Sequence, residues 1–509
     1  MSKTYDLLVV GGGINGVAIA RDAAGRGLRV LLCEKGDLAA ATSSASSKLV
    51  HGGLRYLEHG DFRLVRESLA EREVLLRMAP YLVTPMSFVL PQGPGSRPRW
   101  LVRAGLFLYD RLGGARSLPG ARALDLRQEA LGAPLRMPGA GFTYADCRVD
   151  DSRLTVVTAR DAAERGAAIL TRTALVAAKR DTDGWRATLQ SEDGAAREVA
   201  ARVLVNAAGP WVVELLRLAG LSAHMALRLV KGSHIVVPRL YEGEHAYLLQ
   251  NDDGRIVFVI PFARDFSLIG TTELPFNGDP ATVAITEDEI AYLCRAVARW
   301  FARPPRAADV VWHYAGVRPL YEDRADSASA VTRDYVFDLD TAGPPALSIF
   351  GGKLTTHRRL AEHALARLAP YLPESGPAWT AQSLLPGGAD LRTGGIAALA
   401  AELAHNHPML DVPTAERLAH SYGSEARQIL RRPRGQDFGH GLCEAELRWL
   451  VDKEWVRTAE DVLWRRTKLG LVMSADEMQQ VAAFLARFKL AGAPPAAAAG
   501  APAGQTADR

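Results

Sequence analysis

The segment Gly11-Gly12-Gly13-Ile14-Asn15-Gly16 constrains the fold more than any other part of this 509-residue chain. It follows a short apolar run at residues 5–10 and precedes an alanine-rich stretch that reads as a helix to about residue 25. A second apolar run, residues 29–33, ends in Glu34. A strand, a glycine-rich turn, a helix, a second strand and a terminal acid within about 30 residues form a complete βαβ unit. The chain is therefore predicted to contain a Rossmann-type dinucleotide-binding domain.

Each glycine of this G-x-G-x-x-G motif has a distinct task. Gly11 permits the tight turn, Gly13 lets the backbone approach a pyrophosphate, and Gly16 allows close packing of helix and strand. The pyrophosphate then lies at a helix N-terminus, where N–H groups and the helix dipole favour an anion. Glu34 can accept hydrogen bonds from a ribose and would repel a 2′-phosphate, which disfavours NADP. The motif by itself leaves both NAD and FAD open.

Three further loops favour FAD, because a flavin dinucleotide is long and needs several contact loops. One is the Ser/Thr-rich loop at 42–47, and two are strand–glycine turns at 203–211 and 347–356. His51, beside the glycine pair 52–53, is a further candidate and a conceivable attachment site. The predicted cofactor contacts are Gly11, Gly13, Asn15, Gly16, Glu34, Thr42, Ser43, Ser47, His51, Gly53, Ala208, Gly209, Trp211, Gly352, Leu354 and Thr355.

Composition excludes several classes of protein. With 48% hydrophobic and 23% charged residues the chain reads as globular, and its length indicates two or three domains. A net charge of +4 is too mild to indicate nucleic-acid binding. The four cysteines lie far apart, which predicts no metal site and a reduced, cytoplasmic setting. Neither a targeting segment nor an apolar run of the ~18 residues that span a bilayer is evident.

The pattern along the chain divides it into four parts. Residues 1–80, 141–215 and 341–384 are assigned to a discontinuous FAD-binding domain. Strand patterns at 233–237, 255–260, 266–270, 310–317 and 335–339 indicate an inserted β-rich substrate domain over 216–340, to which a basic amphipathic segment at 81–140 is added. Residues 385–490 read as an all-helical domain, and the Ala/Pro/Gly-rich residues 491–509 as a disordered tail. The predicted fold class is α/β.

Several motifs together resemble one family. AATSSASSKLVHGGLRYLEH (40–59), KGSHIVVP, GTTE, GVRPL, TRDY, FGGKLTTHR and the C-terminal FGHGLCEAELRWLVDKEWVRTAEDVLWRRTKLGL are similar to segments of the FAD-dependent, respiratory glycerol-3-phosphate dehydrogenases. The similarity extends in order from Tyr5 to about Leu490. It implies a glycine-oxidase-like FAD domain and oxidation of sn-glycerol 3-phosphate to dihydroxyacetone phosphate by hydride transfer from C2 to flavin N5. Electrons would pass to a membrane quinone, with the enzyme peripheral on the inner face of the cytoplasmic membrane; a homodimer is compatible with this reading.

Phosphate recognition and proton removal define the predicted substrate site. A phosphomonoester carries nearly two negative charges and needs several cations, which Arg55, Arg318, Arg333 and Lys353 could supply at the ends of these motifs. Each could instead be a surface charge or a structural ion pair. Hydride leaves C2 only when the C2 hydroxyl loses its proton. His234 is the predicted base, with Arg318 stabilising the alkoxide. Tyr56 and Thr271 are predicted to bind substrate hydroxyls.

Residues 97–111 predict a contact with anionic lipid. Trp100, Leu101, Phe107 and Leu108 are large and apolar, and arginines flank or interrupt them. A basic amphipathic helix of this kind lies in a lipid interface. The alternative is a helix packed on its own domain.

Three other functions stay open at this stage. One is a glycerol-3-phosphate oxidase that passes electrons to O₂. Another is an amine or 2-hydroxyacid oxidase of the same superfamily, because one arginine binds a carboxylate as well as a phosphate. The third is a flavoprotein without catalytic activity, such as a sensor.

Overall fold

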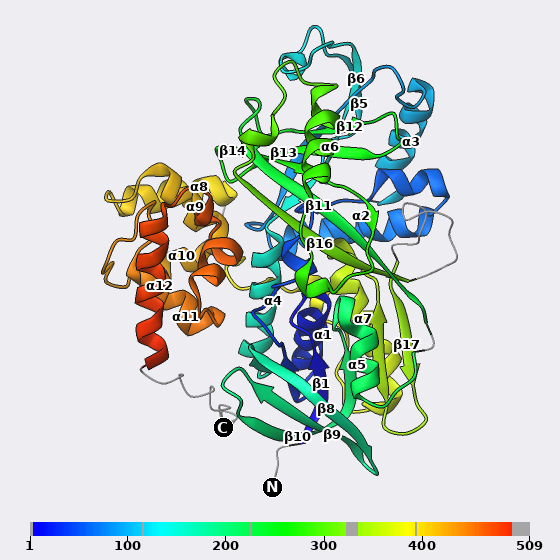
Figure 1. Ribbon diagram of the computed structural model, residues 1–509, viewed down its shortest axis with the longest axis vertical. Coiled ribbons are helices and arrows are strands. Elements are labelled where there is room, and N and C mark those ends of the chain that lie inside the picture. The colour runs from blue at the N-terminus through cyan, green and yellow to red at the C-terminus, as the bar shows by residue number, and fades with distance from the viewer. Residues whose placement is uncertain (1–3, 115–116, 224, 322–333, 392–393, 491–509) are drawn as a thin grey trace, which may run out of the picture.

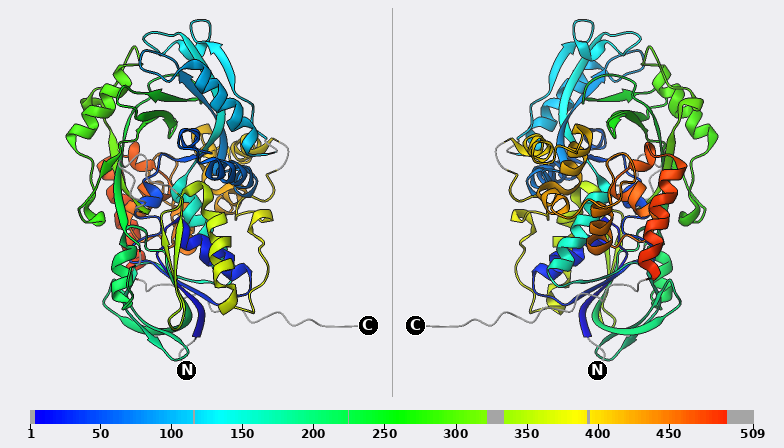
Figure 2. Two further views of the ribbon diagram at one scale, coloured as in Figure 1. Left: turned by 90° about the vertical axis from the view of Figure 1, so that its right-hand side faces the viewer. Right: turned by 90° about the vertical axis from the view of Figure 1, so that its left-hand side faces the viewer.

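The computed structural model describes residues 4–114, 117–223, 225–321, 334–391 and 394–490. Two sheets with their helices occupy the two ends of the long axis, and a group of helices from the C-terminal quarter lies against one side (Figures 1 and 2). Arg333 and the predicted tail 491–509 lie outside the described residues. No helix in the described ranges is both long and apolar enough to cross a membrane.

The first sheet is the predicted Rossmann-type sheet. Its path runs β17-β18-β10-β1-β2-β7, in which β18, β10, β1, β2 and β7 are parallel and β17 is antiparallel to β18. Two further strands, β8 and β9, extend from β10 as an antiparallel arm. The strands are β1 (Thr4–Val10), β2 (Val30–Cys33), β7 (Ala168–Leu170), β8 (Thr173–Asp181), β9 (Gly184–Ser191), β10 (Ala196–Asn206), β17 (Val336–Asp340) and β18 (Ala346–Phe350).

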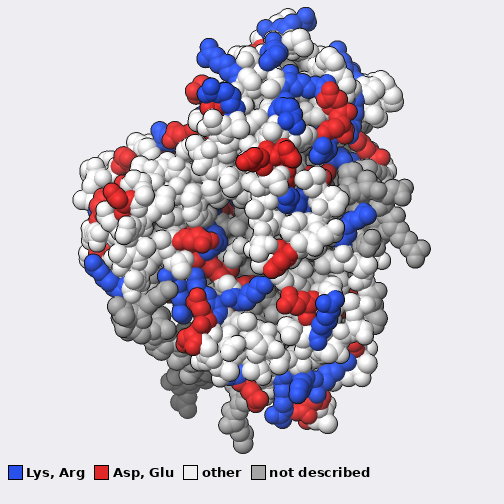
Figure 3. All heavy atoms as spheres, in the orientation of Figure 1, with Lys and Arg blue, Asp and Glu red and all other residues white. Residues whose placement is uncertain are grey.

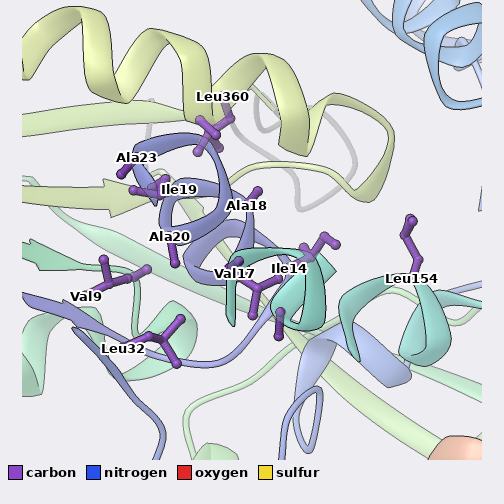
Figure 4. Packing of buried hydrophobic residues seen from close by; sticks show 14 of the residues in the cluster. Val9, Ile14, Val17, Ala18, Ile19, Ala20, Ala23, Leu32, Leu154 and Leu360 are labelled. Atoms are coloured by element: carbon purple, nitrogen blue, oxygen red, sulfur yellow. The ribbon is translucent and has the colours of Figure 1, made fainter. Parts of the chain in front are cut away.

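Three helices pack together over one face of this sheet. They are α1 (Ile14–Gly25), α4 (Asp151–Glu164) and α7 (His357–Leu368). Figure 4 shows Val17 and Ile14 of α1 beside Leu154 of α4, with Leu360 of α7 on the other side of α1. These side chains are buried, and apolar burial of this kind is the main stabilising contribution to such a domain. It fixes the N-terminus of α1 at the carboxyl edge of β1.

The second sheet is built mainly from the predicted β-rich region. Its path is β15-β11-β14-β13-β12-β4-β6-β3, with β16 paired to β11 and β5 paired to β6. Helix α6 (Glu287–Ala298) packs on it, and α2 (Phe62–Met78) and α3 (Arg99–Leu112) lie beside it. The strands are β3 (Leu49–Val50), β4 (Val83–Pro91), β5 (Arg122–Asp125), β6 (Ala140–Val149), β11 (Leu227–Pro238), β12 (Ala246–Gln250), β13 (Ile256–Phe262), β14 (Phe266–Gly270), β15 (Leu274–Pro275) and β16 (Trp312–Tyr321).

The structure differs from the sequence-based division in three places. Strand β17, expected in the β-rich domain, pairs with β18 in the Rossmann-type sheet. Strands β3 and β6 lie in or overlap ranges assigned to the FAD-binding domain but pair in the second sheet. The segment 81–140 is more than a membrane-contact element, because it contributes β4 and β5 to that sheet. Strand patterns reveal a buried face without revealing which sheet it joins.

The C-terminal part is helical, as predicted. One of its turns, η11 (Asp461–Arg466), is π-helical. These helices have their own apolar core and form a separate domain, which packs against α4 of the Rossmann-type domain (Figure 1). The helices of this domain are α8 (Gly395–Asn406), α9 (Val412–Tyr422), α10 (Ala426–Leu430), α11 (Glu444–Glu454) and α12 (Ala475–Leu490). The remaining helix, α5 (Val212–Leu218), follows β10 in the first domain.

Candidate functional site

The glycine motif forms a close backbone turn between β1 and α1. Gly11 has a φ of +115°, and a Cβ there would lie 2.4 Å from the carbonyl oxygen of Ala207. A Cβ on Gly16 would lie 1.9 Å from the carbonyl oxygen of Gly11. At Gly13, in contrast, the nearest protein atom would be Ser43 Oγ at 3.1 Å. Gly11 and Gly16 are therefore required by the protein itself, whereas the space at Gly13 faces a ligand cavity.

Glu34 lies at the end of β2 and faces the same turn. Its carboxylate accepts hydrogen bonds from the backbone N–H of Gly12 at 2.6 Å and of Gly36 at 2.7 Å. Burial raises the pKa of Glu34, and these two N–H donors oppose that shift. Because each carboxylate oxygen can accept more than one hydrogen bond, Glu34 keeps acceptor capacity for ribose hydroxyls.

The Ser/Thr-rich loop joins the two sheets. Thr42 Oγ1 donates to the carbonyl of Val317 on β16 at 2.6 Å, and Ser43 Oγ accepts from the N–H of Ile14 at 2.9 Å. A Cβ on Gly316 would lie 2.7 Å from Ala45, so β16 passes directly against this loop. The loop thereby brings the end of β16, which carries Arg318, next to the N-terminus of α1.

A cavity of about 580 Å³ runs between these segments. This is within the ~300–1,000 Å³ usual for small-molecule and cofactor sites. Gly16 is packed behind the turn, and Gly53 lines a neighbouring cavity instead. The wall contains most of the predicted cofactor contacts, namely Gly11, Gly13, Asn15, Glu34, Thr42, Ser43, Ser47, His51, Ala208, Gly209, Trp211, Gly352, Leu354 and Thr355.

Two observations show that the wall fits FAD. Asn15 Oδ1 is buried and has no hydrogen-bond partner among the described residues, while its Nδ2 donates to the carbonyl of Gly351 at 3.2 Å. The turn at Gly351 and Gly352, with φ values of +77° and +103°, presents backbone to the cavity just before η7 (Leu354–Thr356) and α7. A cavity with a pyrophosphate turn, a ribose acid and an amide acceptor suits a flavin dinucleotide.

Cationic and hydroxyl groups gather where β11, β14 and β16 meet this cavity. Arg318 donates to Glu273 at 3.2 Å and to Thr271 Oγ1 at 3.4 Å, and Arg55 donates to the other oxygen of Glu273 at 3.3 Å. Lys353 Nζ lies 3.8 Å from the ring centre of Tyr56. Burial lowers the pKa of Arg318, and the positive charge of Arg55 acts in the same direction. An anion bound here would stabilise the charged form of Arg318 against both effects.

Gly232 leaves room for this cluster. A Cβ there would lie 2.8 Å from Thr271 Oγ1 and 3.0 Å from the Arg318 guanidinium. Arg318, Thr271, Tyr56 and Lys353 line the cavity, whereas Arg55 lines the neighbouring one. Glu273 was missed by the sequence reasoning, although it lies two residues after the predicted Thr271, in the same GTTE motif. Its two arginine partners are distant in sequence and come beside it only in the fold.

His234, the predicted base, is not on the cavity wall, and its catalytic role stays a prediction. Its side chain is 1% exposed, stacks on Tyr314 and is absent from the cavity wall. Its Nε2 lies 2.9 Å from Ser47 Oγ, and Ser47 does line the cavity. Among the described residues the imidazole that lines the cavity is that of His51. His51 was predicted as a cofactor contact only.

A second, mostly apolar cavity of about 330 Å³ adjoins the first. The two share His51, Tyr56, Phe258 and Thr271. Apolar side chains from the turn η2 (Leu54–His59), from α3 and from the second sheet form much of its wall, namely Leu54, Leu57, Leu90, Leu101, Leu108 and Ile256.

Helix α3 has two kinds of apolar side chain. Val102, Leu106 and Tyr109 are buried against the second sheet, which confirms part of the alternative reading, that this helix packs on its own domain. Trp100 and Phe107 are nevertheless 71% and 59% exposed. Tyr109 also accepts a hydrogen bond from the N–H of Gly52 at 2.8 Å, which ties α3 to the loop that carries His51.

Charges of both signs are interspersed over the face drawn in Figure 3, as the small net charge implies. Within the described residues no cluster of histidine, cysteine or acidic side chains has the arrangement of a metal site.

Comparison with known proteins identifies the family. The model described as FAD dependent oxidoreductase matches residues 6–358, and that described as C-terminal domain of alpha-glycerophosphate oxidase matches residues 378–489. A glycerol-3-phosphate dehydrogenase of Pseudomonas aeruginosa is 51% identical over 95% of this chain and 96% of its own length. A D-erythritol 1-phosphate dehydrogenase of Brucella abortus is 49% identical over 93% of this chain and 96% of its own.

A solved structure agrees with this assignment and bears on the cofactor. The glycerol-3-phosphate dehydrogenase of Bacillus halodurans, crystallised with FAD, superimposes with a TM-score of 0.73 at 26% identity, covering 97% of this chain and 96% of its own. The chain thus has the glycine-oxidase-like FAD fold with a C-terminal helical domain, as predicted. We conclude that the chain belongs to the FAD-dependent glycerol-3-phosphate dehydrogenase family and that its cofactor is FAD.

Proposed function

We propose that this enzyme oxidises sn-glycerol 3-phosphate to dihydroxyacetone phosphate and passes the electrons to a membrane quinone. The observation that carries the proposal is the group of cations at one end of the FAD cavity, where Arg318, Lys353 and the adjacent Arg55 surround the hydroxyls of Thr271 and Tyr56. The names of the relatives at about 50% identity support a polyol phosphate as substrate.

The cationic groups gathered at this end of the cavity support phosphate binding. Glu273 lies between the two arginines and accepts a hydrogen bond from each. The two guanidinium groups and the Lys353 ammonium are the kind of group that suits a dianionic phosphate. Arginine forks also match phosphate oxygens geometrically. Arg333, predicted to join them, lies outside the described residues.

The residues around the reacting carbon must remove a proton while a hydride leaves. FAD, when bound, accepts the hydride from C2. We assign the removal of the C2 hydroxyl proton to His51, whose imidazole is on the wall shared by both cavities. Arg318 stabilises the negative charge that develops on the oxygen. The Ser47 hydroxyl, which His234 holds, also faces this cavity. The alcohol thus loses one hydride and one proton and becomes the ketone.

The apolar cavity supports a quinone as the acceptor. It adjoins the FAD cavity and is lined by leucines of α3, so a lipid-soluble ring could approach the cofactor from the side of that helix. Over a full turnover the quinone gains two electrons and two protons and becomes a quinol. O₂ would need neither an apolar chamber nor a helix with exposed Trp100 and Phe107.

Helix α3 also supports docking on anionic lipid, on the inner face of the cytoplasmic membrane. Trp100 and Phe107 project from the protein, while Arg99, Arg103 and Arg111 are exposed on the same helix. Aromatic side chains enter the acyl boundary, and each arginine near an anionic surface contributes about 1 kcal/mol.

The test uses one enzyme preparation with two acceptors. With vesicles that contain anionic lipid and a quinone, we expect quinol formation and little peroxide per turnover. Changing Trp100 and Phe107 to Ser should release the enzyme from vesicles and reduce quinone turnover, while activity with a small soluble dye stays normal. Leu101 is left intact because it lines the apolar cavity. Stoichiometric peroxide in the presence of quinone would refute the dehydrogenase assignment.

D-Erythritol 1-phosphate is the second candidate substrate, because a dehydrogenase named for it is nearly as similar to this chain as the glycerol-3-phosphate dehydrogenase. Both substrates present a phosphate and a neighbouring secondary hydroxyl, which the same cations and base could accept. Comparing kcat/KM for the two phosphates decides between them.

A further inference from the structure

A buried ion-pair cluster joins the C-terminal domain to the loop that follows Glu34. Asp37 in this loop is 3% exposed. Arg466 reaches both of its carboxylate oxygens, at 2.7 and 2.8 Å, and Arg465 Nε reaches one of them at 2.7 Å. Both arginines come from η11, more than 400 positions away in the chain. Two guanidinium groups thus converge on one carboxylate across the domain boundary.

The same turn also contacts this loop indirectly, through Arg172. Asp461 of η11 accepts hydrogen bonds from Arg465 at 2.6 Å and from Arg172 at 2.5 Å. The backbone N–H of Arg172 in turn donates to the carbonyl of Gly36 at 2.8 Å, and the next N–H, of Thr173, donates to the carbonyl of Glu34. Burial would raise the pKa of Asp461, but the charge of Arg172 and the other donors lower it to about 2. Asp461 is therefore ionised near neutral pH.

These contacts fix the residues that meet the cofactor, although Asp37 itself does not line the cavity. Glu34, Lys35 and Gly36 do line it. Gly36 donates its N–H to the Glu34 carboxylate at 2.7 Å, so a shift of Gly36 moves the acid that is placed to bind the ribose. The cluster lies outside the cavity wall, so it acts on the cofactor site through the loop residues on either side of Asp37, such as Gly36 and Ala39.

We propose that the C-terminal helical domain clamps this loop through Asp37, Arg465 and Arg466 and thereby sets the affinity for FAD. In the clamped loop the ribose acid is in place before the cofactor arrives, so binding loses less conformational entropy than it would with a free loop. Asp37 and its arginines are thus positioning residues for the cofactor. The proposal concerns FAD retention and does not depend on which substrate or electron acceptor the enzyme uses.

The test measures the affinity of the full-length apoprotein for FAD. Asp37→Asn removes the charge at nearly constant shape. We expect it to raise the Kd for FAD by ten- to a hundredfold, with kcat at saturating FAD within about twofold of the wild type. Glu425→Gln is the matched control, because Glu425 also crosses to α4, by bonds of 2.7 and 2.8 Å to Arg160, and does not touch the loop. The Kd of Glu425→Gln for FAD should stay within twofold of the wild-type value, even when its unfolding midpoint falls as far as that of Asp37→Asn.

A milder variant keeps the test decisive if Asp37→Asn does not fold. Arg465→Lys retains the charge but cannot bind Asp37, Glu460 and Asp461 together, as Arg465 does. Arg465→Lys should also raise the Kd for FAD, by a smaller factor than Asp37→Asn. Unchanged Kd values in the loop variants, or an equal change in Glu425→Gln, would overturn the proposal and make the cluster a general interdomain contact.

Discussion

Ser47 Oγ lies 2.9 Å from Nε2 of His234, and of the two side chains the serine is the one on the wall of the FAD cavity. Burial lowers the pKa of His234 well below its usual 6.5, and the positive charges of Arg318 and Lys48 add to this. The imidazole is therefore neutral in the working enzyme. A neutral imidazole behind a serine orients the hydroxyl, and it influences the reaction through that hydroxyl alone.

The two residues should consequently behave as one unit in mutagenesis. Ser47→Ala and His234→Gln should each lower kcat by roughly tenfold, the equivalent of one hydrogen bond of ~1.4 kcal/mol, and the double variant should be no slower than either. Because His234 stays neutral, the kcat profiles of wild type and His234→Gln should have the same shape between pH 6 and 8. Tyr314→Phe, which keeps the ring stacked on His234, is the control. Multiplicative losses would show that the residues act independently.

The glycine motif separates a ligand requirement from a folding requirement. Gly13→Val should fold but lose FAD, because the space beyond Gly13 belongs to the cavity, with only Ser43 Oγ nearby at 3.1 Å. Gly16→Ala should instead lose folded protein, since its Cβ would meet the Gly11 carbonyl at 1.9 Å. Flavin absorbance per chain and circular dichroism distinguish the two effects. Full flavin content in folded Gly13→Val protein would contradict this placement of the pyrophosphate.

Phosphate recognition should depend strongly on Arg318. Arg318→Ala removes a half-buried guanidinium from the cavity wall. We expect kcat/KM to fall by about 3–5 kcal/mol of transition-state stabilisation, with FAD content unchanged. Arg318→Lys should recover part of this loss because it restores the charge without the fork. Near-normal turnover and KM in Arg318→Ala would show that the phosphate does not bind at this end of the cavity.

His357 gives a prediction for stability against pH. It is the first residue of α7, its Nδ1 lies 2.7 Å from the Leu354 carbonyl, and burial lowers its pKa from 6.5 to about 4. Between these values the unfolded chain binds a proton that the folded chain does not, so stability falls as the pH falls from 6.5 to 4. The loss is about 1.4 kcal/mol per pH unit, and above pH 6.5 there is none.

Denaturant titrations of wild type and His357→Asn at pH 7, 6 and 5 isolate this contribution, since the other histidines are common to both. The variant should show the shallower dependence on pH. Parallel curves for the two proteins would mean that His357 is not held neutral.

Much of the site could be predicted because its residues are in sequence motifs at the ends of strands. The glycines, Glu34 and the 42–47 loop need special backbone geometry or short polar side chains, which leave a local signature. Gly11, Gly13, Glu34 and most of the 42–47 loop line one cavity. The contact between Ser47 and His234 joins positions 187 apart and has no local signature. Sequence reasoning placed His234 near the reacting centre but could not show that Ser47 lies on the cavity side of it.

The division into domains was less predictable than the elements themselves. Strand β17 has a pattern that either sheet could accept, and the pattern does not identify β18 as its partner. The clamp on Asp37 likewise depends on how the C-terminal domain packs, and a lone aspartate after a strand carries no signal of a partner more than 400 residues away.

The measurement that tests the central claim most directly is an anaerobic titration of the purified, FAD-loaded enzyme with sn-glycerol 3-phosphate, followed by flavin absorbance. We predict that the absorbance is bleached by one equivalent of substrate per flavin and returns when a quinone analogue is added without oxygen. A flavin that stays oxidised with excess sn-glycerol 3-phosphate would contradict the account.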